Sequence, residues 1–127
     1  MSFNWADYLE LARNLYASPT TSGREEAALR SATSRAYYAA FHLALEFARA
    51  ESYLPYHTGD DHQSLVKYFQ RSATDKTRKR LGTELDRMRD SRRQADYETT
   101  LHQSPRAMAD LTIKRAERVV EILKSLA

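Results

Sequence analysis

Apolar side chains recur along most of the chain at the three- and four-residue spacing that is typical of helices buried on one face. The spacing predicts helices over residues 4–16, 22–50, 61–71 and 74–93, and a fifth from residue 105 onward. Ser22 followed by Glu25 predicts a capping box at the second helix, and Thr74 and Ser104 are the expected N-caps of the last two. With only three Gly and three Pro, the chain lacks the turns of an all-β fold. The 127 residues therefore predict one all-α domain, a five-helix up-and-down bundle.

The second predicted helix is apolar over most of its circumference. Tyr37 belongs to its main stripe, whereas Tyr38 and Leu45 fall on nearly the opposite side with Ser34 beside them, next to a polar strip that includes Arg35 and His42. A helix with apolar residues on two sides is normally covered on both. We expect a second copy of the chain to cover the Ser34, Tyr38 and Leu45 face, which predicts a homodimer. The alternative is that Tyr38 and Leu45 are ordinary exposed apolar residues.

An arginine interrupts the apolar stripe of the fourth predicted helix. Leu81, Leu85 and Met88 lie on one face, and the next position of that face is Arg92. A buried guanidinium needs a partner, which Asp96 supplies if the helix extends that far. Two interpretations stay open: a structural Arg92–Asp96 pair, or a partly buried guanidinium that presents its donors to a phosphate.

Basic residues are concentrated in one part of the sequence. The chain has 20 basic and 17 acidic residues, but residues 67–93 alone hold ten basic and four acidic ones, a net charge of +6. Such a block is compatible with a polyanionic partner, and equally with a solvated helix face.

Several classes of function are excluded or disfavoured. The absence of cysteine removes disulfides and thiol nucleophiles, and no apolar run approaches the roughly 20 residues that span a bilayer. His42, His57, His62 and His102 lack the spacing of metal ligands, although a small site around His57 and His62 is an alternative. Phosphate-loop and dinucleotide motifs are missing. We therefore expect a soluble cytoplasmic protein with no cofactor and no metal.

Two segments resemble the signatures of a small prokaryotic branch of the HEPN family (higher eukaryotes and prokaryotes nucleotide-binding). Residues 34–41, SRAYYAAF, resemble Ser-Arg-x-Tyr-Tyr-Ala-x-Phe, and residues 92–97, RRQADY, resemble Arg-x-x-Ala-Asp-Tyr. The order of the segments also agrees, as does a short intervening helix opened by His62, Gln63 and Ser64. The similarity covers about residues 22–126.

The resemblance implies a helical bundle that dimerises through its long helices, with a groove for RNA cleavage or nucleotide binding at the dimer interface. HEPN proteins include toxins of toxin–antitoxin and defence systems, and accessory subunits of minimal nucleotidyltransferases. Ribonuclease members carry an Arg followed by a His; here Arg92 takes the Arg position and Tyr97 the His position. Tyrosine, with an ordinary pKa of about 10, is a poor base at neutral pH.

The sequence therefore supports three hypotheses. The first is an RNA- or nucleotide-binding module, the second a metal-independent endoribonuclease, and the third a non-catalytic subunit that binds a nucleotidyltransferase. Arg92 and Tyr97 are the candidate catalytic residues. The candidate nucleic-acid or nucleotide ligands are Arg35, His42, Arg89, Arg92, Arg93 and Asp96.

Overall fold

A computed structural model of the chain contains five helices. They are α1 (Ala6–Ala17), α2 (Glu25–Ala50), α3 (Asp61–Gln70), α4 (Lys76–Tyr97) and α5 (Pro105–Leu126). The structure describes residues 2–18, 24–54, 61–72 and 74–127, and no strand occurs within these ranges. The prediction of an all-α bundle is confirmed.

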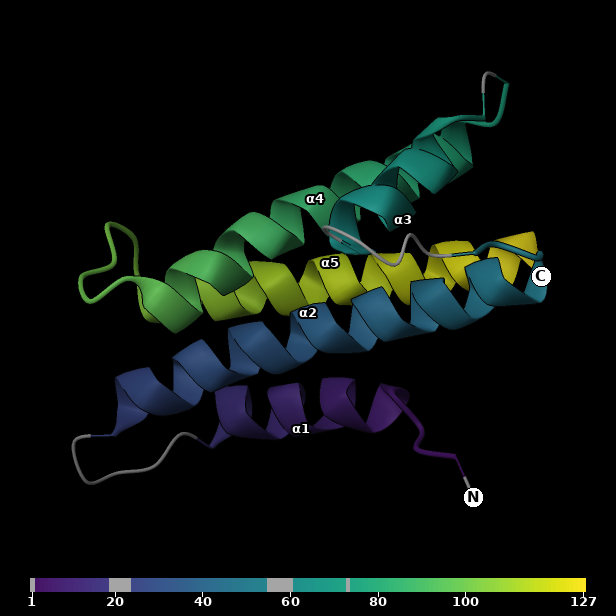
Figure 1. Cartoon of the computed structure of the whole chain (residues 1–127). Helices are drawn as coiled ribbons and strands as arrows, with labels where there is room; N and C mark the ends of the chain where they lie inside the picture. Colours follow the sequence, from purple (N-terminus) through teal and green to yellow (C-terminus); the bar gives the residue numbers. More distant parts are fainter. Residues whose placement is uncertain (1, 19–23, 55–60, 73) are drawn as a thin grey trace.

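The four long helices run alternately up and down (Figure 1). The α2 helix lies in the middle and packs against α1, α4 and α5, while the short α3 packs mainly against α4. The two chain ends lie at the same end of the bundle (Figure 1). None of the described helices combines the length and the apolar character needed to cross a membrane.

Side chains that cap the helix ends agree with the sequence in one case and differ in another. Ser104 caps α5 by accepting a hydrogen bond from the backbone nitrogen of Ala107, as expected. The cap of α4 is Asp75, and the prediction of Thr74 is wrong. A carboxylate at the N-terminus of a helix also interacts favourably with the helix dipole, which explains the preference for Asp75. The capping box expected for α2 rests on Ser22, which lies outside the described residues.

The α4 helix is longer than its hydrophobic pattern predicts, ending at Tyr97 instead of Arg93. Arg30 of α2 explains the extension. Its guanidinium donates hydrogen bonds to the backbone carbonyls of Ala95, Glu98 and Thr99 at the end of α4. Helix-terminal carbonyls need partners from outside the helix, and a cation at the C-terminus also suits the dipole.

The core accounts for both apolar faces of α2 within a single chain. Leu81, Leu85 and Met88 are fully buried, as the α4 stripe predicts. Leu45 is only 8% exposed and Ser34 is also buried, because neighbouring helices cover this side of α2 as well. A second copy is therefore not needed to bury Ser34 and Leu45, and a homodimer through this face stays a prediction. Tyr38 alone of the three stays partly accessible.

Candidate functional site

The two segments that carry the HEPN resemblance meet in space. Ser34 of α2 donates a hydrogen bond from its hydroxyl to Oδ2 of Asp96 near the end of α4, at 3.3 Å. The same carboxylate oxygen lies 3.6 Å from Nη1 of Arg92. Asp96 thus joins α2 to α4, and the arginine of the second segment lies directly beside the first.

Arg92 lies against the aromatic side chains of α2. The carbon of its guanidinium is 5.3 Å from the centre of the Tyr37 ring and 5.6 Å from that of Tyr38, within the range of cation–π attraction. The side chain is 14% exposed, and its buried Nε has no hydrogen-bond partner among the described residues. Arg92 is therefore partly buried beside Asp96. The structure shows features of both interpretations, because the guanidinium is close to Asp96 and also keeps a donor without a partner among the described residues.

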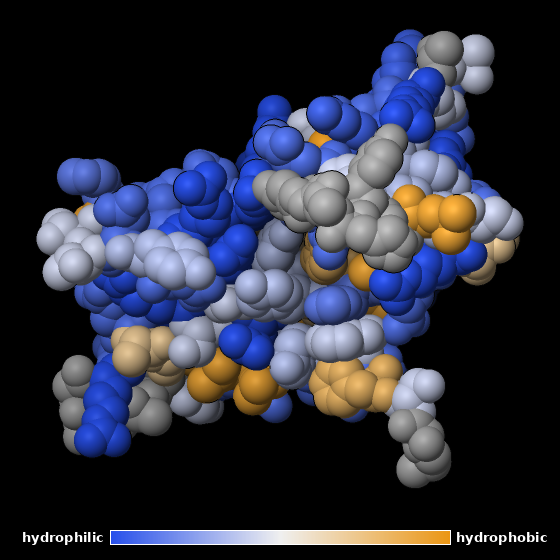
Figure 2. Space-filling view, in the orientation of Figure 1, coloured by the Kyte–Doolittle hydropathy of each residue, from blue (hydrophilic) through white to orange (hydrophobic). Residues whose placement is uncertain are grey.

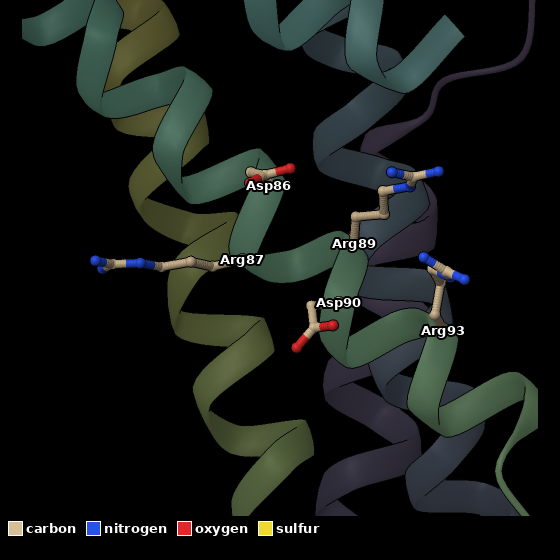
Figure 3. Close-up of a pocket in the computed structure, with 5 residues that line it drawn as sticks. All are labelled: Asp86, Arg87, Arg89, Asp90 and Arg93. Atoms are coloured by element: carbon tan, nitrogen blue, oxygen red, sulfur yellow. The ribbon is translucent and has the colours of Figure 1, made fainter. Parts of the chain in front are cut away.

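Two further arginines of α4 lie next to this centre. Arg89 and Arg93 extend to the same side of the helix, whereas Arg87 points the other way (Figure 3). Together with Asp86 and Asp90, these arginines line an open hollow of about 390 Å³. The Arg89 and Arg93 positions thus extend the positive charge of the Arg92 centre along α4. Figure 2 shows hydrophilic residues gathered over α4 and hydrophobic side chains along α1.

Arg35 and His42 lie on the other side of Tyr38, toward α1. The Arg35 guanidinium is 4.9 Å from the Tyr8 ring centre and 5.8 Å from that of Tyr38. The imidazole of His42 stacks on Trp5, with ring centroids 3.6 Å apart and planes inclined by 11°. The predicted ligands Arg35 and His42 are therefore connected to the Arg92 centre through Tyr38.

The surroundings of His42 favour its neutral form. Desolvation by burial and, to a lesser extent, the charge of Arg49 lower the pKa of His42 below its ordinary value. An uncharged ring stacked on an indole behaves as an aromatic surface and not as a cation.

The candidate proton donors and acceptors are not bonded to Arg92. Tyr97 is 76% exposed at the end of α4. Among the described residues, Arg92 forms no hydrogen bond, ion pair or ring contact with Tyr97, His42 or His102. His102 is exposed in the connection to α5.

A histidine that the sequence did not assign to the Arg92 site lies closer to it. His62 of α3 is 5% exposed, and its Nδ1 lies 2.7 Å from the hydroxyl oxygen of Tyr37. Its Nε2 lies 3.5 Å from a carboxylate oxygen of Asp86 on α4. His62 thereby connects α3 to the ring that supports Arg92. The only feature of the sequence that pointed to His62 was its position at the start of α3. His57 lies outside the described residues.

Arg30 is the second residue that sequence reasoning missed. It fixes the end of α4 through backbone carbonyls, and it lies one helical turn before Ser34 on the same face of α2. That spacing could have identified Arg30 as a neighbour of Ser34. Its partners, however, are backbone carbonyls, which every residue has, so the sequence of α4 does not indicate which of them Arg30 binds.

The basic block of residues 67–93 does not form one continuous surface. Arg78 makes two hydrogen bonds to the Glu51 carboxylate, at 2.9 and 3.1 Å, and its guanidinium lies over the Tyr68 and Phe69 rings. This pairing lowers the pKa of Glu51 and raises that of Arg78. Arg80 lines a different hollow with residues of α5. Only part of the block therefore surrounds Arg92.

The described residues hold no group of three or more His, Asp or Glu side chains that could bind a metal ion. Comparison of the chain with protein-family models, with curated proteins and with solved structures gives no match in any of the three. The geometry around Arg92 and the resemblance of the two segments are therefore what indicates a function.

Proposed function

We propose that the chain is a HEPN-like module that binds RNA through the phosphate groups of the ligand at Arg92. The observation that carries the proposal is the Arg92 guanidinium itself, partly buried between Tyr37, Tyr38 and Asp96 with its Nε unpartnered among the described residues. Arg89 lies three residues before Arg92 in α4 and Arg93 directly after it, and these two arginines extend to the same side of the helix (Figure 3).

The chemistry of this arrangement suits an anion with several oxygens. A guanidinium presents a planar fork of donors that fits phosphate, and aromatic rings behind it fix its orientation without using those donors. Asp96 offsets part of the positive charge of Arg92. We therefore expect a phosphate bound at Arg92 to require a second cation, Arg93 or Arg89. Successive phosphates of a nucleic acid supply such a series of negative charges, and a free nucleotide is the smaller ligand of the same kind.

The test compares two arginines of the same helix. RNA affinity is measured by fluorescence anisotropy over a range of salt concentrations for wild type, Arg92→Ala, Arg92→Lys and Arg80→Ala. We expect binding to weaken steeply with salt, Arg92→Ala to lose at least about tenfold in affinity, and Arg92→Lys to recover only part of it. Arg80→Ala is the matched control, since it removes the same charge from α4 at a hollow shared with α5. Equal losses for Arg92→Ala and Arg80→Ala would reduce the binding to non-specific attraction.

Cleavage is the catalytic form of the same proposal. In it, Arg92 holds the phosphate, and Tyr97 or a histidine moves the proton of the attacking 2′-hydroxyl. Purified protein is incubated with total RNA, with and without chelator, beside Arg92→Ala and Tyr97→Phe. RNA fragments that form in the presence of chelator and are absent with both variants would support an endoribonuclease. RNA that stays intact with the wild-type protein would support a binding module without catalysis.

The accessory-subunit hypothesis replaces the RNA with a nucleotidyltransferase that has an acidic surface. Salt-dependent RNA affinity separates the two hypotheses, because a protein-binding module has no reason to bind RNA at Arg92. Homodimerisation is likewise an expectation from the resemblance. Ser34 and Leu45 are already buried within one chain, so Tyr38 is the one residue of the predicted interface that stays partly accessible. Light scattering, which gives the mass in solution, tests the homodimer directly.

A further inference from the structure

We infer that the beginning of the chain and the partly exposed Tyr38 and His42 of α2 form a stacking surface for unpaired bases. The surface, called here the aromatic strip, consists of Phe3, Trp5, Tyr8, Tyr38 and His42. This inference rests on the proposed function, because it names the class of RNA that binds when phosphates bind at Arg92: single-stranded RNA, whose bases are free to stack.

Three rings at the start of α1 form a compact cluster. The ring centroids of Phe3, Trp5 and Tyr8 lie between 4.9 and 5.4 Å apart, all in edge-to-face arrangements. Phe3 is nonetheless 49% exposed, and Trp5 and Tyr8 are partly exposed. The cluster therefore combines rings that hold one another in place with an aromatic surface that the chain itself leaves open.

The cluster continues onto α2 through a sequence of stacked groups. Trp5 stacks on the ring of His42, and Tyr8 lies against the Arg35 guanidinium. Arg35 and Arg92 both lie within 6 Å of the Tyr38 ring centre, at 5.8 and 5.6 Å. Rings and guanidinium groups thus alternate from Tyr8 through Arg35 and Tyr38 to Arg92. Side-chain contacts thus connect the aromatic strip to the proposed phosphate site, from α1 across α2 to α4.

The charges along this surface favour a nucleic acid over a protein as the occupant. Arg35 forms no ion pair within the described part of the chain and is held by two rings, and the same absence of an ion pair applies to Arg93 on α4. Aromatic side chains with arginines beside them bind single strands in many proteins, because every base has a face that can stack while the cations follow the backbone. An apolar protein partner would use the rings but leave these guanidiniums without counter-charges.

Trp5 allows a direct test, because it is the only tryptophan of the chain. The probes are oligouridylate, oligoadenylate, the duplex formed by mixing the two, and inorganic polyphosphate of matched charge. We expect the single strands, oligoadenylate most strongly, to quench Trp5 emission, and polyphosphate to bind at low salt with little quenching. The duplex is expected to bind more weakly than either strand, because its bases are not free.

Two variants assign the effect to the aromatic strip. Phe3→Ser and Trp5→Leu should each reduce single-strand affinity, measured by anisotropy, by about tenfold, the order of one lost base stack, while polyphosphate affinity stays within twofold. Leu54→Ser is the matched control, since Leu54 is a highly exposed apolar residue remote in sequence from the strip. Circular dichroism of each variant confirms that the bundle is folded.

The outcomes separate this inference from the proposed function. Polyphosphate binding that depends on Arg92, together with unquenched Trp5 and unchanged single-strand affinity in Phe3→Ser, would refute the aromatic strip and leave the phosphate site standing. Absence of binding to every probe would refute both. A Trp5 emission spectrum that shifts on dilution of the protein alone would show that a second copy covers the strip, and would also overturn the inference.

Discussion

At the scale of single residues, the position of Arg92 favours a functional role over a purely structural one. It continues the buried Leu81, Leu85 and Met88 stripe of α4, yet it is a cation whose Nε is buried without a partner among the described residues. Replacing both partners of a buried ion pair with well-packed apolar side chains is often neutral or stabilising, and the Asp96 carboxylate that remains without Arg92 is only partly buried. An arginine kept at such a position for stability alone has no advantage over leucine.

We therefore predict that Arg92→Leu unfolds with a free energy equal to or up to about 1 kcal/mol above that of wild type. The leucine would extend the apolar stripe, while Asp96 keeps the hydroxyl of Ser34 and partial contact with water. The same variant should lose RNA binding. Urea denaturation followed by circular dichroism measures the first effect and anisotropy the second. Destabilisation by about 3–5 kcal/mol would instead identify Arg92 as one half of an essential buried pair.

His42 gives a prediction for pH dependence. Because burial lowers the pKa of His42 in the folded chain, the unfolded chain binds a proton first as the pH falls below about 6.5. The contribution of His42 to stability is therefore present above that pH and is lost as the pH falls from there through the lowered pKa. We expect His42→Gln to show a shallower loss of unfolding free energy over this range. Wild-type Trp5 emission, measured in the same titration, should change where His42 protonates against the indole. Parallel curves for the two proteins would contradict the assigned direction of the shift.

At the scale of elements, the sequence predicted what depends on apolar periodicity and missed what depends on backbone partners. All five helices and the Ser104 cap were expected, because burial of one helix face leaves a regular pattern. The last turn of α4 was missed, since Arg30 supports it through main-chain carbonyls. The Arg92–Asp96 pair could be predicted from their spacing, whereas the contacts of Arg92 with Tyr37 and Tyr38 required the packing of α2 on α4.

The crossing of α3 and α4 depends on a glycine that no sequence pattern marked. A Cβ at Gly82 would lie 2.7 Å from Cγ of Gln70 and 3.1 Å from the carbonyl oxygen of Val66. In an exposed helix, Gly→Ala stabilises by about 1 kcal/mol. Here the new methyl group must displace the Gln70 side chain and push against the Val66 carbonyl of α3.

We predict that Gly82→Ala destabilises the fold by about 1 kcal/mol, because overpacking outweighs the gain in helix propensity. Thermal and urea unfolding measure the effect. The double variant Gly82→Ala/Gln70→Ala removes the closer of the two clashes and should recover part of the loss. A single variant more stable than wild type would show that α3 can move away from α4 without cost.

At the scale of the whole molecule, the basic block seen in the sequence is divided among different sides of the bundle. Arg78 is committed to Glu51 and to two aromatic rings, Arg80 lies toward α5, and Arg93 lies beside Arg92. Charge counted along a sequence cannot separate these positions, because successive residues of a helix point in different directions. Only the side of α4 that carries Arg89 and Arg93 continues the surface on which the proposed ligand lies.

The division predicts different salt dependences for variants that remove the same charge. For single-stranded RNA, each phosphate contact contributes about 0.7 to the slope of log affinity against log salt. Arg93→Ala should reduce the slope by about that amount, and Arg80→Ala should leave it unchanged. Arg78→Ala should also leave the slope unchanged but lower the unfolding free energy by about 1–2 kcal/mol, since it removes a partly exposed ion pair and its ring contacts. Anisotropy titrations at several salt concentrations, beside urea denaturation of the same proteins, measure both effects. A slope that falls equally in Arg80→Ala and Arg93→Ala would mean that RNA extends around α4 to the α5 side, and the binding surface assigned here would be too narrow.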